Sequence, residues 1–476
     1  MPSEPTATHA DNRVHAFTDD ALGDLDATGL AEALRLGKVS RTEVVDAAVA
    51  RAEKVAPTLG AIAYEAFDRA RREAQRPGGE SFFDGVPTFV KDNSAVAGMP
   101  TQEGTSAFKG APALADGDFA STFFKLGVIP LGKTELSEFG LSPSAEGPGH
   151  TVRNPWDPAY SSGASSSGSA ALVGAGVVPM AHANDGGGSI RIPAACCGLV
   201  GLKPSRGRVP QDKMNREMPV QVVADGVVTR SVRDTAAYLR ETEKLARALK
   251  LRPIGDVTGP GRKRLRIGMV IDSLVGTTDA ESAAAVRDAG ELLESLGHHV
   301  EEIPVPVPDS FVEDFKTYYG TLFLAINANG KRMLGPDFDW RKTEPLTRGF
   351  AGYAARHIYR LPGAIARLRA SQRRSRRLYA EYDAVLTPTL SHVTPRIGHL
   401  DPMLPYDVVM PRILDWVGFT PLQNATGDPA VSLPYGLNSN GTPLAIQLAS
   451  GMGCEARLLE LAYEVEEARP FARIQG

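Results

Sequence analysis

Cysteine is scarce in this chain, which has Cys196, Cys197 and Cys454 among 476 residues. An odd number of cysteines, two of them adjacent, argues against a disulfide framework and against a CxxC metal site. Residues 1–17 are polar and lack the apolar core of a secretory signal. We therefore expect a reducing environment and predict a cytoplasmic location.

Long apolar runs are also missing. The longest candidate, residues 170–183, is interrupted by Gly174, Gly176 and Pro179. It is shorter than the roughly 18 apolar residues that a membrane-spanning helix requires. No transmembrane segment is expected.

No sign of charge dominates, because 52 Lys and Arg residues face 56 Asp and Glu residues, for a net charge of −4. This balance gives no electrostatic reason to expect a nucleic acid or an anionic membrane as a partner. One basic run exists, and on a helix it would spread around most of the circumference as a solvated surface. It consists of Arg367, Arg369, Arg373, Arg374, Arg376 and Arg377.

Several common catalytic motifs are absent. The Gly-rich run at 185–189 lacks the GK[ST] ending of a P-loop, which argues against a phosphate site there. The chain has no G-x-S-x-G, HExxH or GxGxxG pattern, which argues against α/β-hydrolase, zincin and dinucleotide-binding proteins. No His, Cys and Asp cluster has metal-ligand spacing. Neither a metal nor an organic cofactor is expected.

The most informative stretch that is present covers residues 163–193. A Ser-rich cluster at 163–169 and a Gly-rich cluster at 185–189 flank an apolar run at 170–178. Three consecutive glycines cost backbone entropy, and their use is to let main-chain N–H groups approach a ligand. Beside Ser189, they predict an oxyanion hole next to a nucleophile. The serines by themselves also fit simple N-capping of a helix at 170–177.

The secondary-structure pattern is that of an α/β protein. Ser40 and Glu43 form a capping box that predicts a helix from there to about residue 55. A β-prone run at 128–131 lies between two predicted helices, at 119–126 and 134–139. Residues 430–437 and 443–449 predict a hairpin. The length suggests two or three domains, but the motifs extend from residue 85 to residue 434, which favours one large domain with an insertion.

At this point six pieces of the chain together resemble the amidase signature hydrolases. They are residues 85–93 (GVPTFVKDN), 131–136 (LGKTEL), 154–156 (NPW), the Ser-rich loop, 185–193 (DGGGSIRIP) and 198–204 (GLVGLKP). The resemblance implies a central, mixed, twisted β-sheet covered by helices on both faces. It also implies a single domain over residues 1–476, with N-terminal helices (1–80), a signature core (81–235), a variable, mostly helical insertion (236–395) and a C-terminal part of the core (396–476).

The family's catalytic residues, carried over position by position, fall on Lys91, Ser165 and Ser189. In the family these are a general base, a serine that follows a cis peptide bond, and the nucleophile. For Lys91 to act as a base, burial must lower its pKa from about 10.4. Around this triad we assign the N–H groups of the Gly-rich run to the oxyanion hole, and a charged pair to bracing the loops. These residues are Gly186, Gly187, Gly188, Asp185 and Arg191. The chain departs from the family at Ser167, where glycine is usual.

The predicted activity is hydrolysis of a linear, small-molecule amide to a carboxylate plus ammonia or an amine, with some esterase activity. We expect a stand-alone amidase that forms a homodimer. Candidates for an apolar substrate pocket are Met99, Phe139, Trp416 and Phe419, with residues 240–380 shaping the entrance.

Three alternatives remain open at this level. His150 or His182 could replace Lys91 as the base. The chain could be the A subunit of a glutamine-dependent tRNA amidotransferase, in which an Asp binds the substrate ammonium. The matched position here is Val417, with Asp415 nearby. A non-catalytic binding protein on the same fold is disfavoured, because all three catalytic residue types are present.

Overall fold

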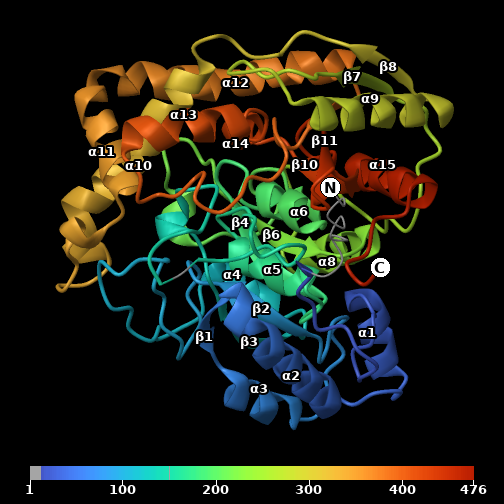
Figure 1. Cartoon of the computed structure of the whole chain (residues 1–476). Helices are drawn as coiled ribbons and strands as arrows, with labels where there is room; N and C mark the ends of the chain where they lie inside the picture. Colours follow the sequence, from blue (N-terminus) through green and yellow to red (C-terminus); the bar gives the residue numbers. More distant parts are fainter. Residues whose placement is uncertain (1–11, 150) are drawn as a thin grey trace, which may run out of the picture.

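An eight-stranded mixed sheet runs through the centre of the molecule (Figure 1). The computed structural model describes residues 12–149 and 151–476. In spatial order the strands are β4 (Met180–Asp185), β6 (Ala224–Thr229), β5 (Val200–Lys203), β10 (Ala430–Leu437), β11 (Pro443–Ala449), β9 (Ala384–Pro388), β7 (Arg266–Met269) and β8 (His299–Glu302). Neighbours from β4 to β9 pair antiparallel, whereas β7 is parallel to both β9 and β8.

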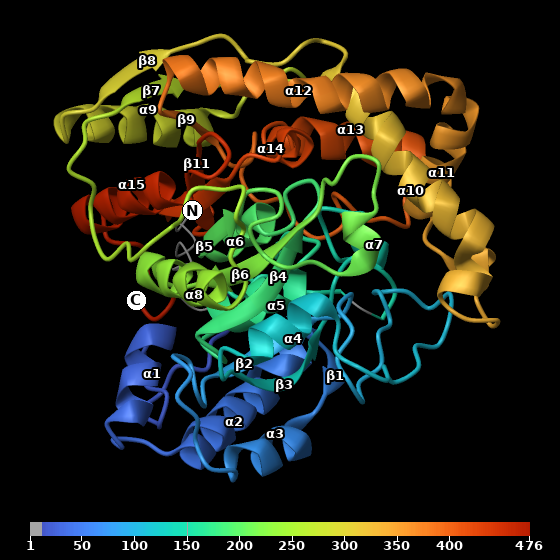
Figure 2. The ribbon, with the colours of Figure 1, turned by 180° about the vertical axis from the view of Figure 1, so that it is seen from behind.

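Helices pack on both faces of this sheet, as the two opposite views show (Figures 1 and 2). One group, α8, α9 and α15, contacts β6, β10 and β11, and a second group, α5 and α6, contacts β4, β5 and β10. The α-helices are α1 (Ala27–Arg35), α2 (Arg41–Leu59), α3 (Phe67–Ala74), α4 (Asp118–Phe124), α5 (Ser167–Gly174), α6 (Arg191–Cys197), α7 (Lys213–Arg216), α8 (Val232–Leu245), α9 (Ala280–Ser295), α10 (Phe311–Met333), α11 (Pro345–Arg356), α12 (Leu361–Glu381), α13 (Tyr406–Trp416), α14 (Pro421–Thr426) and α15 (Glu455–Ala468). The predicted fold class is confirmed.

Local sequence signals explain several of these boundaries. The Ser40 and Glu43 capping box satisfies the first N–H groups of α2, and Gly60 ends that helix in the left-handed conformation. The hairpin predicted at 430–437 and 443–449 is β10 and β11. In contrast, the helix predicted at 134–139 is wrong. The chain there leaves a strand and makes only a short 3-10 turn, η2 (Glu138–Gly140).

A second, three-stranded sheet brings the N-terminal part of the chain to the edge of the large one. Its order is β1 (Ile62–Glu65), β3 (Ile129–Thr134) and β2 (Pro87–Lys91). Side chains connect β2 to β4, since the Thr88 hydroxyl donates to the Met180 carbonyl at 2.9 Å and the Lys91 N–H donates to His182 Nδ1 at 3.2 Å. The ends of β2 and β4 therefore lie together.

The segment 236–395 is mostly helical, with α9, α10, α11 and α12 as its longest elements. Its short strands β7, β8 and β9 are part of the large sheet. Its helices α10, α11 and α12 form a layer at one side of the molecule (Figure 2). This layer covers the sheet end that carries the candidate site.

Two sequence-based expectations concern residues outside the described ranges. His150, a candidate base, is one, and most of the polar N-terminal stretch 1–17 is the other. Within residues 12–149 and 151–476, no helix combines the length and the apolar character that crossing a membrane requires.

Candidate active site

Lys91 is the last residue of β2, and its side chain is completely buried. Its Nζ lies 2.7 Å from Ser165 Oγ and 2.7 Å from Asn184 Oδ1. Burial disfavours the charged form and lowers the pKa of Lys91 to about 7, although the charges of Asp225, Glu103 and Asp185 act in the opposite direction. A substantial fraction of this lysine is therefore neutral near neutral pH.

Ser165 lies in the loop that enters α5, and its peptide bond to Ala164 is cis. A side chain at Gly140 would place a Cβ 3.3 Å from Ser165 Oγ, so glycine at that position leaves space beside the hydroxyl. The next serines do not simply cap α5, because Ser166, its N-cap residue, makes no side-chain capping bond. Instead, Ser166 Oγ donates to the Asn184 carbonyl, and Ser167 Oγ donates to the Glu135 carbonyl. The Ser-rich loop thus ties three segments together.

The Gly-rich run forms a turn between β4 and α6, and Ser189 follows it. Gly188 has a φ of 134°, and a Cβ there would collide with the Thr420 side chain, so only glycine fits. The Gly188 N–H donates to Asp185 Oδ1 at 2.7 Å and is therefore occupied. Within the described part of the chain, the N–H groups of Gly186, Gly187 and Ser189 have no acceptor. The predicted set of free donors is corrected by removing Gly188.

Asp185 and Arg191 form a buried ion pair beneath this turn. Burial alone would raise the pKa of Asp185, but the charge and hydrogen bonds of Arg191 lower it to about 2. Arg191 also donates to the side-chain oxygens of Gln423, Asn424 and Gln447. The pair therefore joins the Gly-rich turn to the C-terminal part of the chain.

His182 is not placed to act as a base. Its Nδ1 accepts the Lys91 N–H, and its Nε2 lies 3.3 Å from Asp225 Oδ1. Burial lowers the pKa of His182, and the ring is stacked on Phe119 with centroids 4.0 Å apart. Both nitrogens are engaged in holding the strands together.

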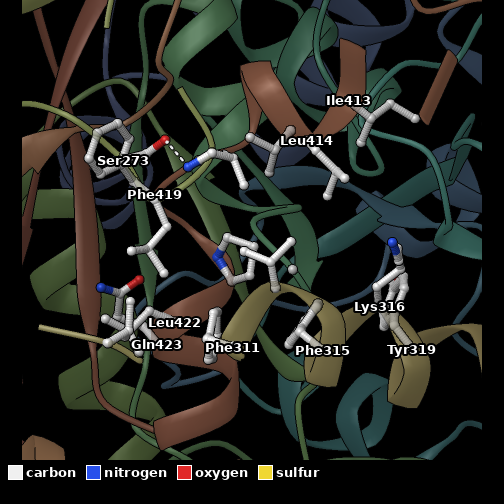
Figure 3. A pocket seen from close by; sticks show the side chains of 18 of the residues that line it. Ser273, Phe311, Phe315, Lys316, Tyr319, Ile413, Leu414, Phe419, Leu422 and Gln423 are labelled. Atoms are coloured by element: carbon white, nitrogen blue, oxygen red, sulfur yellow. Dashed lines mark hydrogen bonds between the residues drawn. The ribbon is translucent and has the colours of Figure 1, made fainter. Parts of the chain in front are cut away.

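A cavity of about 160 Å³ opens beside Ser189 and Gly187. Helix α10 contributes aromatic side chains one helical turn apart, with Phe311 and Phe315 centroids 6.0 Å apart and Phe315 and Tyr319 centroids 5.6 Å apart. Figure 3 shows this aromatic row facing Ile413, Leu414 and Phe419 across the cavity. Of the described residues that line it, Lys316 alone carries a charge.

The four predicted pocket residues have different places. Phe419 lines the cavity. Met99 packs in a separate apolar cluster with Val90 and Val96, and Trp416 is buried in the main core with its indole N–H donating to the His392 carbonyl. Phe139 is half-buried and packs against two clusters, one around Phe108 and one that includes Phe350. The assignment of Met99, Trp416 and Phe139 to the pocket is corrected, because none of them lines the cavity.

The position matched to the amidotransferase Asp also lies at this cavity. Val417 lines it, whereas Asp415 does not and approaches His392 Nε2 at 3.0 Å. No Asp or Glu is among the described residues of the lining. A shifted alignment therefore does not restore a carboxylate at this place.

Two groups of site residues were missed by sequence reasoning. The aromatic row of α10 had a signal, namely aromatic residues at a spacing of four at positions 311, 315 and 319. Asn93 and Asn184, which contact each other beside Lys91, had none, because an asparagine within a motif is as compatible with a turn as with a site. Among residues 12–149 and 151–476, no three His, Cys, Asp or Glu side chains are grouped so as to hold a metal ion.

Comparisons with known proteins define an amide hydrolase. A family model described as Amidase matches residues 43–459, and the chain therefore belongs to the amidase signature family. It is 54% identical over 468 residues to a protein named "Putative amidase AmiC" from Mycobacterium leprae (strain TN), covering 97% of this chain and 99% of that protein.

Two solved structures extend the comparison. The structure of 6-aminohexanoate cyclic dimer hydrolase complexed with substrate matches with a TM-score of 0.87 and 30% identity, covering 96% of this chain and 99% of that one. The A-type chain of the glutamyl-tRNA(Gln) amidotransferase from Thermotoga maritima matches with a TM-score of 0.74 and 24% identity over 95% and 96% of the two chains. The second likeness is one of fold.

Proposed function

We propose that the protein is a stand-alone amidase in which Lys91, Ser165 and Ser189 form the catalytic triad. The observation that carries this proposal is the 2.7 Å contact of Lys91 Nζ with Ser165 Oγ, combined with a pKa of about 7 for Lys91. A serine hydroxyl needs a base to become a good nucleophile. Here a neutral lysine contacts one serine, and a second serine follows a run of N–H groups that includes donors without an acceptor. This arrangement meets that need.

In the proposed reaction Lys91 accepts a proton from Ser165, and Ser165 accepts one from Ser189. Ser189 Oγ attacks the amide carbonyl carbon and forms a tetrahedral intermediate. The carbon–nitrogen bond then breaks as Ser165 gives its proton to the nitrogen and regains one from Lys91, which releases ammonia or an amine. Water attacks the acyl-enzyme through the same relay in reverse and yields the carboxylate.

The oxyanion is assigned to the N–H groups of Gly186, Gly187 and Ser189. Their freedom from other acceptors supports this assignment, since a donor that already serves Asp185 cannot also stabilise developing charge. Asp185 and Arg191 hold the turn in shape and take no proton.

The substrate is an uncharged, linear amide with an apolar group that enters the cavity. The apolar lining supports this, as does the state of Lys316, which is already paired with Glu313 and lies 4.4 Å from the ring centroid of Tyr353. Esters of the same acyl group are also substrates, because an alkoxide leaves more readily than an amine. The absence of an acidic residue from the described lining disfavours the amidotransferase alternative.

Labelling with a fluorophosphonate followed by peptide mass spectrometry tests the assignment of the nucleophile. We expect a single adduct on Ser189 and none in Ser189→Ala. The purified chain, without any partner, should hydrolyse a simple apolar amide. An adduct on Ser165 or Ser166, or activity that requires further subunits, would overturn the proposal.

A further inference from the structure

Asn184 and Asn93 form a pair of side-chain amides beside Lys91. Asn184 Nδ2 donates to Asn93 Oδ1 at 2.9 Å, and Asn93 Nδ2 lies 3.3 Å from Asn184 Oδ1. The same Asn184 oxygen accepts from Lys91 Nζ at 2.7 Å. Asn184 is buried and Asn93 is half-buried, so the pair extends from the interior toward the surface.

A neutral amine has two N–H bonds and one lone pair, and only the lone pair can take a proton from a serine. Asn184 offers Lys91 only acceptors, since its Oδ1 lies at 2.7 Å and its main-chain oxygen at 3.5 Å. With its N–H bonds directed at these oxygens, the amine turns its lone pair toward Ser165 Oγ. The geometry therefore decides which way the base points.

We infer that Asn184, held in orientation by Asn93, is a positioning residue that directs the lone pair of Lys91 at Ser165 while leaving the amine free to exist uncharged. This inference rests on the proposed function, because it assumes that Lys91 is the base. It concerns residues that act through Lys91, since Asn184 contacts the Lys91 amine and Asn93 contacts Asn184.

An amide suits this position better than a carboxylate because it adds no negative charge. Lys91 is already surrounded by groups that influence its charge. These are Asp185 and His182 on β4, Asp225 on β6, Glu103 and Asp92 in the segment after β2, and Lys133 on β3. Asp92 is paired with Lys133 at 2.8 Å, and His182 is neutral. A further carboxylate in direct contact would favour the ammonium form, which cannot act as a base.

Asn93 matters because a half-turn of a side-chain amide exchanges the positions of its oxygen and its NH₂ group. If Asn184 rotated by half a turn, its NH₂ group would face Lys91 and would compete with Ser165 for the lone pair. Donation from Asn184 Nδ2 to Asn93 Oδ1 holds the productive orientation. The main chain of Asn184 is fixed independently by Ser166 Oγ, which contacts its N–H at 3.3 Å and its carbonyl at 3.2 Å.

The test places a carboxylate at each position in turn and follows the pH dependence of kcat/KM on an apolar amide. Asn184→Asp should move the rising limb to higher pH by at least about one unit, which is roughly a tenfold loss at pH 7 that is recovered in alkali. Asn93 contacts Asn184 rather than the Lys91 amine. Asn93→Asp should therefore move the rising limb in the same direction by a smaller amount. The pH dependence of fluorophosphonate inactivation of Ser189 should show the same shifts.

Asn154→Asp is the matched control. Asn154 is also buried, and it donates to the carbonyls of Ser161 and Cys196 away from Lys91. Any effect of this variant should be the same at every pH. If Asn184→Asp does not fold, Asn93→Asp carries the test, because its side chain is only half-buried.

Two outcomes separate this inference from the function on which it rests. If the wild-type limb disappears in Lys91→Ala but neither aspartate variant moves it, the positioning role is wrong and the triad stands. If the limb persists in Lys91→Ala, the proposed base is wrong, and the inference falls with it.

Discussion

Arg191 and Asp185 meet through two parallel hydrogen bonds, from Nε to Oδ2 and from Nη2 to Oδ1, each 2.9 Å long. Both side chains are completely buried. Breaking such a pair leaves one charge without a partner in the interior, which costs more than the pair itself contributes.

Asp185→Asn should therefore lower the free energy of unfolding by about 3–5 kcal/mol at pH 7, as measured by urea denaturation. The matched control is Asp46→Asn, which removes the exposed partner of Arg71 and should change stability by less than about 1 kcal/mol. A similar small effect at both positions would contradict a bracing role for Asp185.

The same pair predicts a pH dependence of stability. Because the folded-state pKa of Asp185 is about 2 and lies below its ordinary value, its contribution is present at neutral pH and is lost as the pH falls from about 4 to about 2. Wild type should lose stability faster than Asp185→Asn over this range. Parallel stability curves for the two proteins between pH 5 and pH 2 would count against the ion pair.

Lys91→Ala should harm amide hydrolysis more than ester hydrolysis. An amine cannot leave as its anion and needs a proton from the relay, whereas an alkoxide leaves with less help. Since acid–base groups contribute roughly 10²- to 10⁴-fold, the amide-to-ester preference should fall by about one to two powers of ten. Wild-type activity should rise with pH near 7, where Lys91 loses its proton, and the variant should lack this rise. The measurement is kcat/KM for one acyl group presented as amide and as ester; equal losses would make Lys91 structural.

Leu414→Trp should close the cavity from the side opposite the aromatic row of α10. We expect kcat/KM for a bulky apolar amide to fall by at least about tenfold, while labelling of Ser189 by a small fluorophosphonate continues. Leu36→Trp adds the same ring at an exposed site on the C-cap of α1 and serves as the control. Unchanged selectivity in Leu414→Trp would show that substrates do not use this cavity.

The quaternary state is a further prediction. We expect a symmetric homodimer, because two-fold dimers are the commonest closed assemblies. Light scattering after gel filtration should therefore give a mass twice the 50.7 kDa of the chain. Copurification in a fixed ratio with two other subunits would support the amidotransferase alternative instead.

What could be predicted from the sequence depended on whether a local signal existed. The capping box of α2 and the β10–β11 hairpin are set by contacts between near neighbours, so their patterns were sufficient. The cavity was not predictable in the same way, because its walls come from residues 141–192, 270–319 and 346–423. An apolar residue such as Trp416 has the same character in a core as in a pocket, and only the folded chain decides between them.

The error at residues 134–139 has a physical cause. The run Thr134–Phe139 reads as helical by composition, but Thr134 already pairs with Lys91 across the parallel strands β2 and β3. Phe139 adopts a left-handed φ of 49°, which ends any regular helix. Tertiary pairing thus overrode local preference, and the turn brings Gly140 against Ser165.

Helix α10 is separate in sequence from the strands and loops that carry Lys91, Ser165 and Ser189. The hydroxyl of its Tyr319 donates to the Gly140 carbonyl at 3.2 Å. The aromatic row proposed to contact a substrate and the groups proposed to cleave it thus belong to different stretches of the chain. In directed evolution, libraries built at positions 311, 315 and 319 would explore new substrates while the inherited chemistry stays fixed. Replacing the whole of α10 by the matching helix of a relative would change the same wall of the cavity in a single step.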